Sequence, residues 1–172
     1  ESIVWVKVPE IDALSGSDYI WMYWGNELPG YAIEPFDVWS NGYRGVWHLS
    51  DDEYDSSINM NDGDDYGSSL DTGFIGGGRR VNADSWIEVD DEDSLDLGSG
   101  PYTIELWMNK DDTAMMLALA KAHGYSPSRW SVGWGSTTCA FRVDNIYNTS
   151  DAVITTGNWH YVVYTNDGTW VR

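Results

Sequence analysis

The sequence predicts an all-β protein whose strands are mostly antiparallel, and three observations support this fold class. Side chains alternate with a period of two in residues 102–108 and 159–164, as they do in strands with two unlike faces. Turn-forming residues precede both segments, and Asp167-Gly168, a dipeptide typical of tight hairpins, follows the second. The chain also holds 18 Gly, 11 Trp and 11 Tyr and little sustained helical periodicity. Short strands joined by many turns are therefore expected.

The first predicted element is a hairpin at the N-terminal end of the chain. Residues 2–11 alternate, with Ile3 and Trp5 on one face and Val4 on the other, and residues 18–24 form the second strand. Residues 12–17, which are small or polar except Leu14, join the two segments. This hairpin would form a short N-terminal β module.

Further strands are predicted near Trp47 and over residues 85–89, 102–108, 130–134 and 159–164. Residues 113–122, Thr-Ala-Met-Met-Leu-Ala-Leu-Ala-Lys-Ala, have the best helix propensity in the chain. We nevertheless expect a strand there, because propensity is a weak preference that an all-β environment overrides.

The charge of the chain excludes some partners. It carries 28 Asp and Glu against 9 Lys and Arg, a net charge of −19. Such a surface repels nucleic acid and anionic lipid. The chain contains no run of about 18 apolar residues, so no membrane insertion by this segment is expected. Cys139, the single cysteine, has a strand-like setting and is expected to be a small buried residue.

An ordered series of motifs runs through the second part of the chain. It consists of Val46-Trp47-His48-Leu49, an Asp/Asn/Gly loop over residues 51–67, Asp93-Ser94-Leu95-Asp96-Leu97, the strand at 102–108, and Gly157-Asn158-Trp159-His160-Tyr161 with the strand that follows. This series resembles the laminin-G-like branch of the concanavalin A-like lectin/glucanase superfamily. The resemblance implies an antiparallel β-sandwich of the jelly-roll type over residues 45–172, and recognition on a cell surface or outside the cell.

Residues 1–44 carry a second resemblance. The run Val4-Trp5-Val6-Lys7-Val8-Pro9, then Tyr23-Trp24-Gly25-Asn26, is similar to the end of an uncharacterised module found upstream of laminin-G-like domains in prokaryotic surface proteins. The expectation is that only the C-terminal strands of that module are present. The sandwich is likewise expected to be incomplete at its C-terminus, within the hairpin that opens at Asn166-Asp167-Gly168.

The acidic loop is the candidate metal site. Eight acidic residues and no Lys or Arg lie between Asp51 and Asp71, so the loop repels itself unless something neutralises it. The candidate Ca²⁺ ligands are hard oxygen donors among small residues: Asp51, Asp55, Asn59, Asn61 and Asp62. Residues 55–63 resemble the Asp-Ser-Ser-Gly-Asn-Gly-Asn-Asp-Gly loop of laminin-G-like proteins, with Ile58 and Met60 where glycines are usual. The alternative is a solvated turn without metal.

Catalytic patterns in the chain are weak. Glu88-Val89-Asp90-Asp91-Glu92-Asp93 nearly matches the Glu-x-Asp-x-x-Glu strand of laminarinase-type glycosidases, which share this sandwich. A charged turn between two strands explains the same residues. His48, His123 and His160 have no zinc-ligand spacing and are expected to pack or form hydrogen bonds. The chain is therefore predicted not to be an enzyme.

The tryptophans are the candidate ligand-binding residues. Eleven Trp exceed what one core of this size usually holds, and exposed indoles stack on the apolar C–H faces of sugars. The candidates for stacking are Trp130, Trp134 and Trp170, and the alternative is that they fill the core. Asn148-Thr149-Ser150 is the one Asn-x-Thr/Ser glycosylation sequence, in a polar stretch expected to be turn-like.

These observations predict a non-catalytic recognition or adhesion module that binds a glycan or a cell-surface polymer, with calcium as its candidate cofactor. The alternative is a structural subunit of an extracellular filament or surface layer, which would self-associate through edge strands. A glycoside hydrolase is the third function class.

Overall fold

The computed structural model describes residues 3–13, 16–22, 35–98, 100–114, 116–121, 130–135, 137–143 and 146–168. Within this part of the chain the structure is nearly all β, and every pair of neighbouring strands is antiparallel. The predicted all-β, antiparallel class is therefore confirmed. The chain divides into two compact units, Glu1–Asp90 (the first unit) and Asp91–Arg172 (the second unit). The predicted domain boundary near Gly45 stays a prediction.

The elements in chain order are α1 (Pro35–Val38), β1 (Gly63–Tyr66), β2 (Ser69–Thr72), β3 (Gly77–Arg80), β4 (Trp86–Val89), the 3-10 helix η1 (Asp93–Leu95), β5 (Tyr102–Asn109), β6 (Met116–Lys121), β7 (Trp130–Trp134), β8 (Thr138–Val143), β9 (Ile146–Val153) and β10 (Trp159–Asn166). Among the described residues, no helix is long and apolar enough to cross a membrane.

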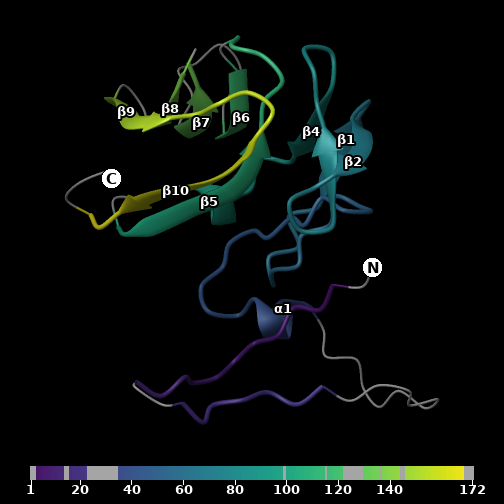
Figure 1. Ribbon diagram of the computed structural model, residues 1–172, viewed down its shortest axis with the longest axis vertical. Coiled ribbons are helices and arrows are strands. Elements are labelled where there is room, and N and C mark those ends of the chain that lie inside the picture. The colour runs from purple at the N-terminus through teal and green to yellow at the C-terminus, as the bar shows by residue number, and fades with distance from the viewer. Residues whose placement is uncertain are drawn as a thin grey trace. The chain divides into compact units, whose positions relative to one another are not determined.

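The first unit contains two small sheets, β1 with β4 and β2 with β3 (Figure 1). β1 and β4 run in register from Gly63 opposite Val89 to Tyr66 opposite Trp86. Near Trp47, where a strand start was predicted, the chain forms only an isolated bridge to Asp55. The strand predicted over residues 85–89 is confirmed as β4.

The predicted N-terminal hairpin does not form among the described residues. Residues 3–13 and 16–22 contain no strand, and side chains on both faces of each segment are exposed, such as Val4 (70%) and Trp21 (73%). A lone two-stranded ribbon is marginal in water, because without a sheet to cover it neither face gains from burial. Alternation alone therefore did not make these segments strands.

The residues most deeply buried in the first unit are polar. Its described part contains four side chains with less than a tenth of their surface exposed, namely Asp55, Ser57, Asn61 and Ser85. Every buried hydrophobic side chain of the described chain belongs instead to the second unit. The first unit is thus organised around hydrogen bonds.

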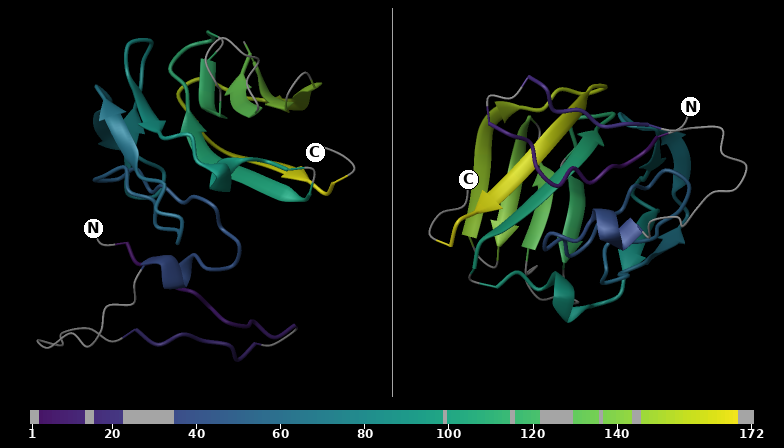
Figure 2. Two further views of the ribbon diagram at one scale, coloured as in Figure 1. Left: turned by 180° about the vertical axis from the view of Figure 1, so that it is seen from behind. Right: turned by 90° about the horizontal axis from the view of Figure 1, so that it is seen from below.

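The second unit has two layers that share one apolar core. The β5–β10 pair lies face to face with the four-stranded sheet β6-β7-β8-β9 (Figures 1 and 2). Met108, Val162 and Tyr164 pack from the pair, and Val132 and Phe141, both 0% exposed, pack from the sheet. Phe141 and Tyr164 meet with ring centroids 4.7 Å apart. The core is therefore built from alternate residues of strands in both layers.

The strands predicted in this unit are largely as expected. Residues 102–108, 130–134 and 159–164 lie in β5, β7 and β10. The helix-prone segment 113–122 contributes β6, so a strand is correct there: β6 pairs with β7, and Met116, Ala118 and Leu119 pack against the core. Asn148, expected in a turn, lies in β9, where it pairs with Phe141 of β8.

Candidate functional site

An exposed aromatic face lies on the outer side of the β5–β10 pair. Because side chains alternate along a strand, residues 102, 104, 106 and 108 face the core and residues 103, 105 and 107 face outward. Trp107 stands opposite Tyr161 in the register, with ring centroids 5.0 Å apart and an angle of 34° between the rings. Trp107 is 37% exposed and Tyr161 50% exposed. We call Glu105, Trp107, Tyr161 and Val163 the outer aromatic face.

A carboxylate belongs to this face. The Tyr161 hydroxyl donates a hydrogen bond of 2.6 Å to Glu105 Oε2, which holds the carboxylate beside the rings. Glu105 is opposite Val163, which is 42% exposed. The face thus combines flat apolar rings with a positioned hydrogen-bond acceptor.

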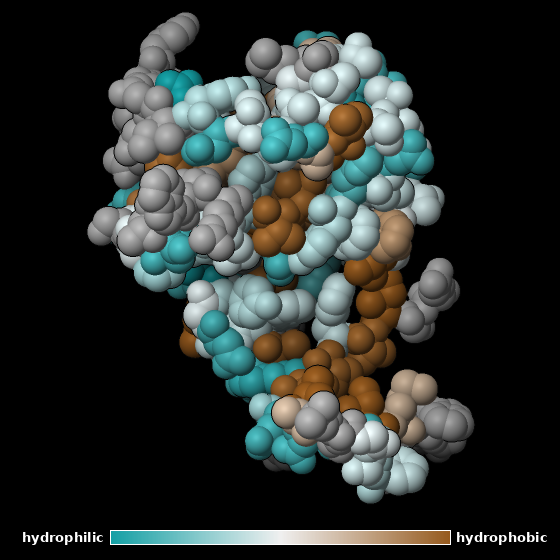
Figure 3. All heavy atoms as spheres, turned by 60° about the vertical axis from the view of Figure 1, so that its left-hand side comes forward, coloured by the Kyte–Doolittle hydropathy of each residue, from teal (hydrophilic) through white to brown (hydrophobic). Residues whose placement is uncertain are grey.

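The first unit carries a second exposed aromatic pair. Tyr66 and Trp86 are opposite each other on β1 and β4 and stack with centroids 5.2 Å apart and an angle of 15°. Trp86 Nε1 donates to Glu88 Oε2 at 3.3 Å. These rings lie face against face, so each covers part of the surface of the other. Other apolar side chains also reach the surface, and Figure 3 shows them in brown.

The tryptophans chosen from the sequence lie elsewhere. Trp130 and Trp134 are 8% and 7% exposed and belong to the core of the second unit. Neither offers a ring face for stacking on a sugar, which corrects that assignment in favour of core filling. Trp170 lies outside the described residues. The sequence did contain the signal for Trp107, because it shares its strand face with Thr103 and Glu105 rather than with Ile104 and Leu106.

The acidic loop of the first unit is organised by the carboxylate of Asp55, which is 7% exposed. Its Oδ1 accepts from the backbone N–H groups of Val46 and Ser57, each at 2.8 Å. Its Oδ2 accepts from Ser57 Oγ at 2.8 Å and from the Asn61 backbone N–H at 3.0 Å. A carboxylate has about four acceptor positions, so protein donors fill this one completely.

The neighbouring polar groups close the same network. Asp62 Oδ1 accepts from the Asp55 backbone N–H at 2.8 Å, and the side-chain amide of Asn61 donates to the carbonyl of Arg44 at 2.8 Å. The backbone carbonyl of Asn61 accepts a hydrogen bond from the indole N–H of Trp47 at 2.8 Å. Met60 has φ +51°, in the left-handed region that favours glycine.

Arginines from β3 form ion pairs with three of the eight acidic residues of the loop. The guanidinium of Arg79, whose side chain is 10% exposed, pairs with Glu53, lies 3.5 Å from Asp65 Oδ2 and donates to the carbonyl of Asp51 at 3.2 Å. Its neighbour Arg80 pairs with Asp71 at 2.8 Å on the surface. The compensating positive charge therefore comes from the chain itself, beyond the end of the acidic segment.

Three of the residues predicted as calcium ligands, Asp55, Asn61 and Asp62, are engaged within the loop in this arrangement, whereas Asp51 is exposed. Asp55 has no acceptor position left, and Asn61 and Asp62 already bond within the loop. A six- to eight-coordinate Ca²⁺ would have to displace several of these bonds. Nor does the described part of the chain hold any group of three or more His, Cys, Asp or Glu side chains arranged for a metal.

We therefore expect millimolar calcium to leave the melting temperature of the protein within about 1 °C of its value in EDTA. Ligands stabilise a fold only when they bind the folded state preferentially, and the loop has no free ligand set to do so. Differential scanning fluorimetry in the two buffers measures this directly, with magnesium as the control cation. A rise of several degrees specific to calcium would show that the loop rearranges around the ion.

An aromatic cluster with a histidine lies in the first unit. The imidazole of His48 stacks on Trp5 with centroids 5.0 Å apart and an angle of 16°, and Trp39 lies 5.6 Å from the same imidazole. Burial lowers the pKa of His48 below its usual value of 6.5, and the nearby carboxylate of Asp52 opposes this only in part. His48 thus packs as predicted. His160 forms hydrogen bonds with Thr155, also as predicted, and His123 lies outside the described residues.

The lowered pKa of His48 predicts that the first unit loses stability in acid. The folded state binds the proton less readily than the unfolded state, so stability is full above pH 6.5 and falls as the pH decreases from 6.5 through the folded pKa. Urea unfolding at pH 7.5 and pH 5 should show a lower midpoint at pH 5, and His48→Phe should reduce that difference. An equal pH effect in His48→Phe would assign it to other groups.

The catalytic candidates do not share one strand. Glu88 lies on β4, which ends at Val89, and Asp93 begins the 3-10 helix η1. Glycosidases of the type considered place nucleophile and acid/base on one strand face, so the required local arrangement is absent from this segment.

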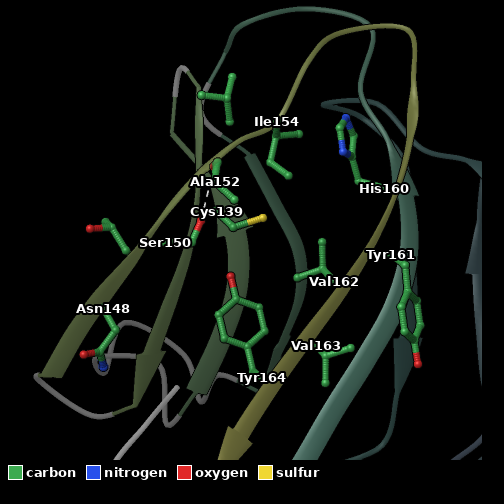
Figure 4. A pocket seen from close by; sticks show the side chains of 12 residues that line it. Cys139, Asn148, Ser150, Ala152, Ile154, His160, Tyr161, Val162, Val163 and Tyr164 are labelled. Atoms are coloured by element: carbon green, nitrogen blue, oxygen red, sulfur yellow. Dashed lines mark hydrogen bonds between the residues drawn. The ribbon is translucent and has the colours of Figure 1, made fainter.

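A groove of about 390 Å³ opens in the second unit beside β10 (Figure 4). Its apolar lining includes Cys139, Ile154 and Val162, and its polar lining includes Asn148 and Tyr164. Burial raises the pKa values of both the Cys139 thiol and the Tyr164 hydroxyl. The Asn148 Nδ2 atom, the predicted glycosylation acceptor, is shielded from solvent in the folded chain.

Comparisons with known proteins do not identify the chain. No family model matches it, and no curated protein and no solved structure is similar enough to match.

Proposed function

We propose that the protein is a non-catalytic extracellular recognition module that binds glycans on the outer aromatic face of β5 and β10. The observation that carries this proposal is the exposed Trp107–Tyr161 pair with the carboxylate of Glu105 held beside it. The resemblance of residues 46–172 to laminin-G-like domains supports the same class, with the second unit as part of a concanavalin A-like sandwich.

The chemistry of the face suits a sugar ring. Pyranose rings have apolar C–H faces that pack on indole and phenol rings, and hydroxyl groups at their rims that need acceptors. Glu105 Oε2 already accepts from Tyr161, and a carboxylate has further acceptor positions for sugar hydroxyls. Rings held on two paired strands lose little freedom when a ligand binds.

The charge of the protein narrows the class of glycan. A net charge of −19 repels acidic polysaccharides such as uronates and sulfated chains at low salt. Neutral or amino-sugar polymers are therefore the proposed ligands.

Replacing Trp107 by Ala should weaken glycan binding by at least about tenfold, because losing one stacked ring costs about 1.4 kcal/mol or more. A glycan array with the full chain identifies the ligand, and isothermal titration calorimetry measures the affinity of the variant for it. The matched control is Trp86→Ala, which removes an exposed indole from the other aromatic pair and should leave the affinity unchanged.

Two outcomes contradict the proposal. If Trp86→Ala weakens binding and Trp107→Ala does not, the site lies on the first unit. If the wild-type protein binds nothing on the array, the proposed recognition function is wrong. A structural subunit of a filament or surface layer then becomes the better explanation. Circular dichroism spectra of both variants exclude unfolding as the cause of a loss.

A further inference from the structure

One face of the β1–β4 pair in the first unit carries two aromatic rings and two carboxylates. On β1, Asp64 and Tyr66 share this face, because side chains alternate along a strand. On β4, Trp86 stands opposite Tyr66 in the register, and Glu88 lies on the same side two positions later, opposite Asp64. All four residues are exposed. We call them the aromatic-acidic face.

The rings and one carboxylate of this face hold each other in place. The stack of Tyr66 on Trp86 covers one side of each ring, and the two residues are still 46% and 50% exposed. The hydrogen bond from Trp86 Nε1 to Glu88 Oε2 keeps the carboxylate next to the indole. A flat apolar surface and a positioned acceptor therefore adjoin each other.

The two carboxylates of the face are directly opposite each other. Like charges in such a cross-strand pair repel and destabilise a sheet. Arg79 pairs with Asp65, which lies between Asp64 and Tyr66 on β1 and so belongs to the other face. In the part of the chain that the structure describes, neither Asp64 nor Glu88 forms an ion pair. The charges of this face therefore favour a cation from outside the described chain.

We infer that the aromatic-acidic face binds arginine side chains on a basic segment of another polypeptide. A guanidinium is flat, so it stacks on an indole, and its N–H groups donate in pairs to a carboxylate. The face presents these two partners side by side in Trp86 and Glu88. The ammonium group of lysine supplies the charge without a flat surface. A calcium ion needs six to eight oxygen ligands, which two carboxylates do not supply.

The charge of the first unit supports a basic segment as the occupant. Within Glu1–Asp90 the sequence has 18 Asp and Glu residues but only four Lys and Arg. This charge attracts a segment that carries several arginines and repels a second copy of the same chain. The partner is therefore a different polypeptide. The aromatic-acidic face is separate from the outer aromatic face of β5 and β10, so the inference does not depend on glycan binding.

The test uses the full chain and the synthetic peptide Ser-Arg-Ser-Arg-Ser-Arg-Ser at physiological ionic strength. We expect saturable binding by isothermal titration calorimetry and a shift of the indole N–H resonance of Trp86. The same peptide with lysine in place of arginine should bind about two- to fivefold more weakly, because it loses the stacking. The citrulline peptide keeps the flat shape but not the charge, and it should not bind detectably.

Two substitutions separate this face from the general charge of the protein. Trp86→Ala should weaken binding of the arginine peptide about two- to fivefold, and Glu88→Gln should weaken it at least as much. Glu88→Gln also relieves the repulsion with Asp64, so the melting temperature should not fall and unfolding does not explain the loss. The matched control is Asp84→Asn, which removes an exposed charge of the same unit outside the face and should leave the affinity unchanged.

Three results would overturn the inference. The first is that the arginine peptide does not bind at millimolar concentration. The second is equal affinity for the arginine and lysine peptides, which would show attraction by net charge alone. The third is an equal loss of affinity in Asp84→Asn and Glu88→Gln, which would place the peptide elsewhere on the acidic surface.

Discussion

Asp55→Ala should destabilise the first unit by about 3–4 kcal/mol. The substitution removes the acceptor for four hydrogen bonds and leaves the donors of Val46, Ser57 and Asn61 without partners in a buried place. Each buried donor without a partner costs about 1–3 kcal/mol, and partial entry of water keeps the total below the sum. The effect should be large because this unit has no buried hydrophobic side chain among its described residues to hold the loop by other means.

Urea unfolding measures this loss, and the indole N–H resonance of Trp47, which reports its hydrogen bond to Asn61, shows whether the loop is disrupted. The matched control is Asp64→Ala, which removes an exposed carboxylate from β1 of the same unit and should change stability by less than about 0.5 kcal/mol. Equal effects of the two substitutions would show that the Asp55 network does not organise the loop.

Arg79→Met should destabilise the same unit by about 2–3 kcal/mol. Methionine keeps much of the apolar stem but removes the charge that faces Glu53 and Asp65, so the partly buried carboxylate of Glu53 is left uncompensated and the exposed Asp65 loses a neighbouring cation. Their repulsion also predicts a salt effect. Raising the ionic strength from 0.1 to 1 M shortens the Debye length from about 10 to about 3 Å, and this should recover part of the lost stability.

The neighbouring residue provides the control. Arg80 pairs with Asp71 at the surface, where the two side chains are 53% and 45% exposed, so Arg80→Met should cost at most about 1 kcal/mol. Thermal unfolding of both variants at the two salt concentrations makes the comparison. A larger loss in Arg80→Met than in Arg79→Met would contradict the assignment of Arg79 as the cation of the loop.

The sequence predicted strands correctly where alternation meets a real core. In residues 102–108 and 159–164 one set of alternate side chains is buried and the other is exposed, so the local pattern and the packing agree. Residues 3–13 have the same alternation without a buried face, and there the prediction was wrong. A local pattern records which side chains could face a core but not whether a sheet lies opposite them.

The acidic loop shows a different limit. Its eight acidic residues left two alternatives, a bound cation or a solvated turn, and the oxygen donors with the resemblance of residues 55–63 suggested calcium as that cation. The pairing of β2 with β3 places Arg79 opposite Leu70 and so returns a guanidinium to the start of the loop. The position of Arg79 beside the loop depends on the register between β2 and β3. The sequence does not specify this register, because β2 has no buried face and no strand was predicted there.

Part of the outer aromatic face could have been predicted from the sequence. Once residues 102–109 are known to form a strand, the polar side chains of Thr103 and Glu105 indicate which face points outward. Trp107 lies on that same face because it follows Glu105 by two positions. The stacking partner Tyr161 could not be found in the same way, because it is 54 positions further along and meets Trp107 only through the β5–β10 register.

The polar interior of the first unit also affects how its stability changes with temperature. The heat capacity of unfolding rises with newly exposed apolar surface and falls with newly exposed polar surface, by about 0.45 and 0.26 cal/mol/K per Å² respectively. A unit whose most buried side chains are Asp55, Ser57, Asn61 and Ser85 exposes a larger share of polar surface when it unfolds than a unit with a buried apolar core. Its free energy of unfolding should therefore change with temperature in a shallow, nearly linear way. On cooling, this free energy should continue to rise at temperatures where that of a unit with an apolar core already decreases.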